Sequence, residues 1–170
     1  GVAKYTEGPY NGTNESSKLN NAADSDLQNI SDNSGQIVPV TDVSFLEFDF
    51  TPLSSNFSFD FLFASEEYGN FQCLFSDAFA FLLTNLNTGV TSNLAVVPNS
   101  NTPISVVTIR DFLYNSACTS ENAQFFGSFN GGTQAASSAT NFNGQTVVMN
   151  ASATLTPNIP YRIKLVIADR

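Results

Sequence analysis

Histidine and tryptophan are absent from this 170-residue chain. Without histidine, the Ser-His-Asp and Cys-His systems that activate a nucleophile cannot form, and most zinc sites lose a common ligand. The sequence also lacks a GxSxG elbow, a phosphate-binding P-loop and a dinucleotide-binding fingerprint. These absences predict a protein that is not an enzyme and has no catalytic residues.

Charged residues are scarce. Asp, Glu, Lys and Arg make up 12% of the chain, about half of their usual share. Most of these charges are negative, with 15 acidic and 6 basic residues and a net charge of −9. A negatively charged chain cannot replace the counterions on the phosphates of nucleic acid, and an anionic membrane surface repels it. We therefore expect no nucleic-acid partner and no membrane insertion. The acidic residues either keep the protein soluble or bind divalent cations.

The chain has only two cysteines, Cys73 and Cys118. Two cysteines in a secreted β domain usually form a disulfide, and closing a loop of this size stabilises a fold by about 4 kcal/mol. The alternative is a pair of buried free thiols in a cytosolic protein. We predict the disulfide, which indicates an oxidising compartment outside the cytosol.

Phenylalanine is abundant, with 16 residues, and it alternates with other residues in segments 46–50 and 57–63. A period of two predicts half-buried strands, and the four phenylalanines of 57–63 predict a central core strand. Apolar or β-branched runs predict five more strands, at 78–83, 94–97, 104–109, 146–154 and 161–167. Turn residues separate these segments, including a tight-turn signal at Asn143-Gly144. About seven strands at short spacing predict an all-β fold, an antiparallel β-sandwich or jelly-roll-like arrangement with long loops and little helix. The candidates for a short helix are residues 65–70 and 112–114.

Residues 1–40 are polar and show no clear pattern, in contrast to the strand-rich remainder. We predict a single domain over residues 1–170, with a loop-rich lead segment at 1–40 and the sandwich core at 41–170. No signal peptide or membrane-spanning stretch is visible. Residues 127–139 are small and polar, which predicts a further loop.

Acidic residues near the ends of predicted strands are candidates for two kinds of site. Asp49 and Asp60, expected on neighbouring strands, could face each other as a glycosidase pair, although no tryptophan is available to line a sugar cleft. Calcium, which prefers oxygen ligands, is the better match. The candidate calcium ligands are Asp24, Asp26, Glu67, Asp77 and Asp169. The alternative is that these are solvated loop carboxylates.

Several segments together resemble the choice-of-anchor L domain, a module of secreted and surface proteins of bacteria. The resemblance runs nearly the full length and is carried by LEFDFTP (46–52), ASEEY (64–68), FSDAFAF (75–81), FNGQT (142–146) and YRIKLVIAD (161–169). It implies an extracellular, non-catalytic domain of a secreted or bacterial cell-surface protein. Members of that family have strand sequence before the position of Gly1 and after that of Asp169. We therefore expect either a longer chain or strands supplied by neighbouring subunits.

These observations predict a structural or adhesive subunit of an extracellular surface filament or assembly. Its partners would be copies of itself or neighbouring surface proteins. The alternative is a calcium-dependent carbohydrate- or peptide-binding module of a larger adhesin. An enzyme is the third and weakest hypothesis.

Overall fold

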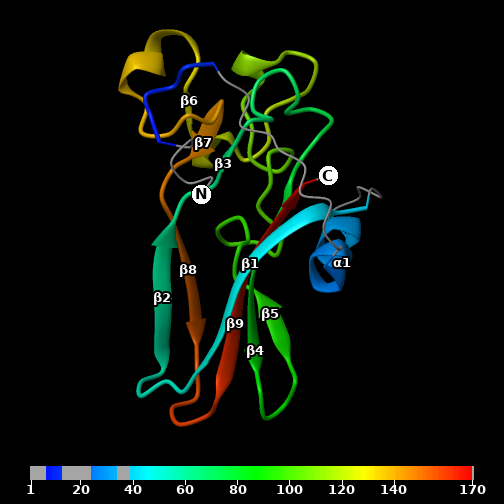
Figure 1. Ribbon diagram of the computed structural model, residues 1–170, viewed down its shortest axis with the longest axis vertical. Coiled ribbons are helices and arrows are strands. Elements are labelled where there is room, and N and C mark those ends of the chain that lie inside the picture. The colour runs from blue at the N-terminus through cyan, green and yellow to red at the C-terminus, as the bar shows by residue number, and fades with distance from the viewer. Residues whose placement is uncertain (1–6, 13–23, 34–38, 170) are drawn as a thin grey trace. The chain divides into compact units, whose positions relative to one another are not determined.

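The structure, a computed structural model, describes residues 7–12, 24–33 and 39–169 (Figure 1). The chain forms two compact units that alternate along the sequence. Unit 1 comprises Gly1–Leu19, Leu62–Asp77 and Ser105–Met149, and unit 2 comprises Asn20–Phe61, Ala78–Ile104 and Asn150–Arg170. The prediction of one domain over residues 1–170 stays a prediction.

Unit 2 is built on a four-stranded sheet with the order β1-β9-β4-β5 (Figure 1). Its strands are β1 (Thr41–Phe50), β9 (Tyr161–Asp169), β4 (Ala78–Asn85) and β5 (Thr91–Asn93). All neighbouring pairs are antiparallel. The final strand of the sequence therefore lies at the centre of the sheet, between the first and fourth strands of the chain.

Side chains alternate between the two faces of this sheet because successive residues of a strand point to opposite sides. On the inner face, Phe81 packs with phenylalanines of β2 (Asn56–Phe61). The ring centroids of Phe59 and Phe81 lie 4.9 Å apart. The strand β2 pairs with β8 (Met149–Thr154) to form the second layer. The predicted all-β sandwich is thus confirmed.

The outer face of the sheet packs against a helix, α1 (Ser25–Asn33), drawn in blue in Figure 1. Leu27 is fully buried in a cluster with alanines of β4 and β9, whose small side chains let the helix approach closely. Asp24 begins the helix, since its side chain accepts hydrogen bonds from the amides of Asp26 and Leu27. The expectation that residues 1–40 lack regular structure is therefore wrong for 25–33, where a short helix with one buried stripe gave too weak a periodic signal.

Unit 1 contains a small sheet with the order β3-β7-β6. Its strands are β3 (Ala64–Ser65), β7 (Gly144–Thr146) and β6 (Phe126–Phe129). Among its described residues, this unit also has three short 3₁₀ helices, at Phe112–Tyr114, Ala123–Phe125 and Gly132–Ser137. The helix predicted at 112–114 is confirmed, whereas residues 66–74 form turns instead of the alternative helix.

Three strand predictions need correction. Residues 104–109 form a turn, in which the amide of Ile109 donates to the carbonyl of Ser105. Ile104, Val106 and Ile109 are buried there, so the apolar run reflects burial and not strand pairing. The segment predicted as one strand at 146–154 is divided between β7 and β8. The segment at 94–97 holds only an isolated bridge, because β5 ends at Asn93.

Three further expectations also fail. The predicted central strand 57–63 ends as β2 at Phe61 and belongs to a two-stranded sheet. The loop predicted at 127–139 contains most of β6 and a 3₁₀ helix. Gly144 does not form a tight turn but begins β7 at a point where a Cβ atom would lie 2.8 Å from Tyr68. Glycine is needed there for close packing.

Candidate functional site

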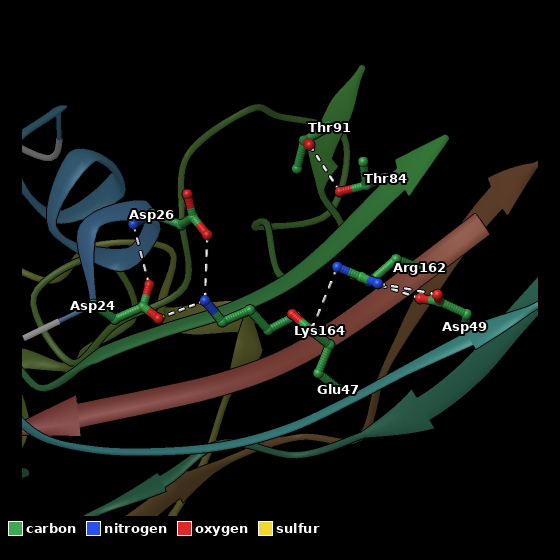
Figure 2. Close-up of polar contacts among 8 residues, drawn as sticks. All are labelled: Asp24, Asp26, Glu47, Asp49, Thr84, Thr91, Arg162 and Lys164. Atoms are coloured by element: carbon green, nitrogen blue, oxygen red, sulfur yellow. Dashed lines mark hydrogen bonds and ion pairs between the residues drawn. The ribbon is translucent and has the colours of Figure 1, made fainter. Parts of the chain in front are cut away.

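Two of the predicted calcium ligands, Asp24 and Asp26, contact a lysine of β9 on the outer face of unit 2 (Figure 2). Lys164 Nζ forms an ion pair with Asp24 and lies 3.2 Å from Asp26 Oδ2. Burial alone would raise the pKa of Asp24, but the hydrogen bond from Lys164 and two backbone amides outweigh it and lower that pKa. Burial likewise opposes the charge of Lys164, yet both carboxylates keep its pKa above its usual value.

The third predicted ligand in unit 2, Asp169, ends β9 opposite Thr41. Asp169 lies five positions along β9 from Lys164, a distance of about 16 Å. Asp169 therefore does not join Asp24 and Asp26. This unit holds the three carboxylates at two separate places.

The remaining predicted ligands, Glu67 and Asp77, lie in unit 1 and close a loop between them. Glu67 Oε2 accepts a hydrogen bond of 2.9 Å from the amide of Asp77. The amide of Glu67 in turn donates to Ser65 Oγ at 3.1 Å. Within the described ranges, no three His, Cys, Asp or Glu side chains approach closely enough to hold a metal ion together. Calcium binding stays a prediction.

The glycosidase pair that was considered as a weaker alternative does not form. Asp49 lies on the outer face of β1, where Arg162 Nε donates to Asp49 Oδ1 at 2.7 Å and lowers the pKa of that carboxyl group. Asp60 lies on β2, in the other layer, and accepts a hydrogen bond of 2.8 Å from Asn150 Nδ2. The two strands are not neighbours in one sheet, so the sequence-based assumption of facing carboxylates is wrong.

The predicted disulfide between Cys73 and Cys118 is present, with a Cα–Cα distance of 5.5 Å. It joins two segments of unit 1, residues 69–75 and 111–120, which we call the paired loops. Side chains reinforce this link. Gln72 is fully buried and its Nε2 donates to the carbonyl of Asp111 at 2.8 Å. Asn115 Nδ2 donates to the carbonyls of Gly69 and Asn70. The paired loops are therefore fixed to each other at several points.

The second of the paired loops is also ordered from within. Asp111 caps the 3₁₀ helix that follows it, since its side chain accepts from the amide of Leu113. Ser120 Oγ accepts from the amide of Phe112 at 3.1 Å and donates to Asp111. The ring of Tyr114 stacks on that of Phe129, with centroids 4.9 Å apart. These contacts hold the backbone in place without covering the neighbouring apolar side chains.

The paired loops expose large apolar side chains, between 40% and 73% of their surface. These side chains are Phe71, Leu74, Phe75, Phe112, Leu113 and Tyr114. No charged residue occurs at 69–76 or at 112–120. Soluble proteins rarely gather apolar surface in this way unless it has a partner. The paired loops are thus the candidate functional site of unit 1.

Sequence reasoning missed the paired loops because apolar residues near a strand are first assigned to the core. The disulfide was a usable signal, since it brings 69–75 beside 111–120. The sequence could not reveal that the apolar residues flanking both cysteines point outward.

The fold and site define a disulfide-bonded, all-β domain with an exposed apolar site on two crosslinked loops. The chain belongs to the choice-of-anchor L domain family, whose profile matches residues 1–170. This membership indicates a secreted or surface-associated protein and confirms the resemblance found in the sequence. No curated protein and no solved structure showed significant similarity to the chain. Of the helices in the described residues, none is long and apolar enough to cross a membrane.

Proposed function

We propose that this domain is a non-enzymatic structural or adhesive module of an extracellular bacterial surface assembly. We further propose that the paired loops form its contact with another copy of the chain. The observation that carries this proposal is the group of exposed apolar side chains on the paired loops. Exposure of such side chains to water is unfavourable in the isolated chain. Burying them against a partner is therefore favourable.

The size of the apolar surface fits a specific contact. Fully covering an aromatic side chain buries about 150–250 Å². Half-exposed side chains at six positions therefore offer roughly 600 Å² of surface. A standard interface buries about 800 Å² on each partner, and a polar rim normally completes the apolar centre. The paired loops supply most of that area.

The charge distribution favours contact at this place. The chain carries a net charge of −9, so two copies repel each other over most of their surfaces. The only charged residue of the paired loops is Asp111, whose carboxylate already accepts hydrogen bonds from Leu113 and Ser120 of the same loop. Two copies can therefore meet through the paired loops without burying opposed carboxylates, which would be costly.

The rigidity of the loops also supports binding. The disulfide and the buried side chain of Gln72 fix the loop backbones before any partner arrives. Association then loses less conformational entropy than it would with mobile loops.

The proposal is tested by replacing two highly exposed leucines, with the double variant Leu74→Ser and Leu113→Ser. Their exposed fractions are 73% and 70%, so the fold should tolerate the change. We expect the wild-type chain to associate as its concentration rises in sedimentation velocity experiments, and the variant to remain monomeric.

A matched control replaces Leu53 and Val90, which are exposed to 89% and 64% in loops of unit 2. The variant Leu53→Ser with Val90→Ser should associate like the wild-type chain. A wild-type chain that stays monomeric at high concentration would contradict the proposed contact. Equal association of both double variants would show that the paired loops are not the interface.

The calcium-dependent binding module is the second candidate function. It rests on the closed loop in which the amide of Asp77 donates to the carboxylate of Glu67, because that hydrogen bond holds Glu67 beside Asp77 and carboxylate oxygens suit calcium. Isothermal titration of the metal-free chain with calcium tests it. Heat that disappears in the variant Glu67→Gln with Asp77→Asn would support this candidate, and absence of heat in the wild-type chain would dismiss it.

A further inference from the structure

The strand β1 forms an edge of the four-stranded sheet in unit 2. It is ten residues long and pairs only with β9 among the strands that the structure describes. An edge strand directs alternate N–H and C=O groups outward, where another extended chain can bind them. Proteins usually protect such edges with short strands, proline or unpaired charges. β1 is long, contains no proline and is regular from Ser44 to Phe50, so of these protections this stretch has only charge, at Glu47 and Asp49.

The inner face of β1 is apolar but only partly covered. Phe50 packs against Phe57 of the second layer, with ring centroids 5.3 Å apart. Farther along the strand, Phe48 is 48% exposed and Leu46 is 58% exposed. The apolar cover supplied by β2 therefore ends near Phe50. A strand added beside β1 would cover this exposed part with its own apolar side chains.

The outer face of β1 carries an excess of negative charge (Figure 2). Glu47 and Asp49 share a single cation, because Arg162 NH1 lies 3.7 Å from Glu47 and Arg162 Nε lies 2.7 Å from Asp49. Lys164 does not relieve this excess, since it pairs with Asp24 and Asp26 of the helix region. A basic side chain on an incoming strand would thus meet unbalanced carboxylates.

A second copy of β1 is a poor partner for this edge. Antiparallel pairing of residues 44–50 with the same segment in full register places Glu47 opposite Glu47. Moving the centre of pairing to Phe48 places Glu47 opposite Asp49 twice. Like charges directly opposite each other destabilise a pair of strands.

We infer that the β1 edge is a binding site for an extended peptide segment of another protein, added as an antiparallel strand, in which large apolar residues alternate with Lys or Arg. The apolar residues would lie over Leu46 and Phe48, and the basic residues beside Glu47 and Asp49. β9 already pairs with the opposite edge of β1 in this manner, with Lys164 opposite Glu47 and Arg162 opposite Asp49. This inference does not depend on the paired loops.

The probe for this site is a synthetic peptide with the sequence of β9, YRIKLVIAD, acetylated and amidated at its ends. The control peptide, YEIELVIAD, keeps the apolar residues and reverses both charges. Binding is measured by isothermal titration to the Leu74→Ser/Leu113→Ser variant, so that association through the paired loops does not interfere. We expect the basic peptide to bind about tenfold more tightly than the acidic one, because two cross-strand charge pairs change sign.

Strand addition itself is checked by amide hydrogen exchange. The basic peptide should slow exchange at alternate amides of residues 45–50, those that point away from β9. The variant Glu47→Lys should bind the basic peptide more weakly and the acidic peptide more tightly than the parent chain does. If that variant is destabilised by its proximity to Arg162, Glu47→Gln should still narrow the difference between the peptides.

Several results would overturn the inference. The inference is wrong if neither peptide binds, if both peptides bind with equal affinity, or if the basic peptide binds without slowing amide exchange in β1. Protection of the β1 amides by self-association of the chain without peptide would identify a second copy as the occupant instead. None of these results depends on whether the paired loops associate.

Discussion

In unit 2 the buried side chains that the structure describes are aliphatic or aromatic, whereas unit 1 buries many polar ones. The buried polar residues of unit 1 are Ser65, Gln72, Ser76, Ser105, Asn130, Asn141 and Thr146. The difference follows from the backbone. Long strands in unit 2 satisfy each other's amides and carbonyls, and an apolar core suffices to hold the layers together. The short strands and loops of unit 1 need side-chain hydrogen bonds and a covalent link.

This comparison indicates two means of stabilisation within one short chain. The regular sheet of unit 2 relies on burial of apolar area. The irregular unit 1 relies on specific polar partners, each of which must be present because a buried polar group without one is costly. The same division separates the two candidate binding surfaces, a strand edge in unit 2 and rigid loops in unit 1.

The largest expected effect comes from removing the disulfide. The cysteines are separated by 45 residues, and a crosslink over that span stabilises by about 4 kcal/mol. Replacing Cys73 and Cys118 by serine should therefore abolish hydrogen-exchange protection first in residues 105–149. The strands β4 and β9 should keep their protection. Hydrogen exchange followed by mass spectrometry provides the measurement.

The matched variant for that experiment is Leu82→Ala in the core of unit 2. Leu82 is 5% exposed, and its truncation should destabilise by about 3 kcal/mol. Protection should then be lost first in β4 and β9. If both variants lose protection in the same segments, the two units are not stabilised separately and the comparison fails.

An intermediate effect is expected from a buried amide of unit 1. Asn130 is 2% exposed, donates to the carbonyl of Phe142 at 2.8 Å and accepts from Ser128 Oγ. Asn130→Ala leaves these partners unsatisfied and should lower the free energy of unfolding by about 2 kcal/mol. Urea titration measures the loss.

The control for Asn130 is Asn150→Ala in unit 2. Asn150 makes a hydrogen bond of similar length to Asp60, but on an exposed surface. Water replaces that bond, so the change should stay within about 0.5 kcal/mol. A loss as large as that of Asn130→Ala would show that burial does not explain the sensitivity of unit 1.

The smallest expected effect concerns the ion pair between Lys164 and Asp24 in unit 2. The folded-state pKa of Asp24 is lowered, so its contribution is present above the usual value and is lost as the pH falls through the folded value. The folded-state pKa of Lys164 is raised, so its contribution is lost only as the pH rises through that higher value. The pair therefore stabilises between about pH 4 and pH 10.

Asp24→Asn should lower the free energy of unfolding by about 1 kcal/mol at pH 7. It should also reduce the fall of that free energy as the pH drops below 7. Thermal unfolding between pH 3 and pH 8 provides the measurement, with Asp60→Asn as the control. An unchanged acid limb in Asp24→Asn would mean that unit 2 depends on its apolar core alone.

The sequence predicted the sandwich because alternation along 46–50 and 161–167 and the continuous apolar run at 78–83 are direct consequences of strand geometry and burial. It failed at 104–109, where buried β-branched residues form a turn, since burial and pairing produce the same apolar run. It also gave no sign of the ion pairs that Asp24 and Asp26 form with a lysine of β9. Their partner Lys164 lies far along the chain, and no local pattern connects them.

By itself, the sequence determined the fold class, the oxidised cysteine pair and the family of this protein, because these depend on periodicity, cysteine number and motif spacing. The tertiary structure alone decided which apolar residues are covered. Phe48 and Phe50 share one face of one strand, yet only Phe50 packs against Phe57 of the second layer. The physical reason is that exposure depends on where a neighbouring layer ends, and that boundary is set by residues distant in sequence.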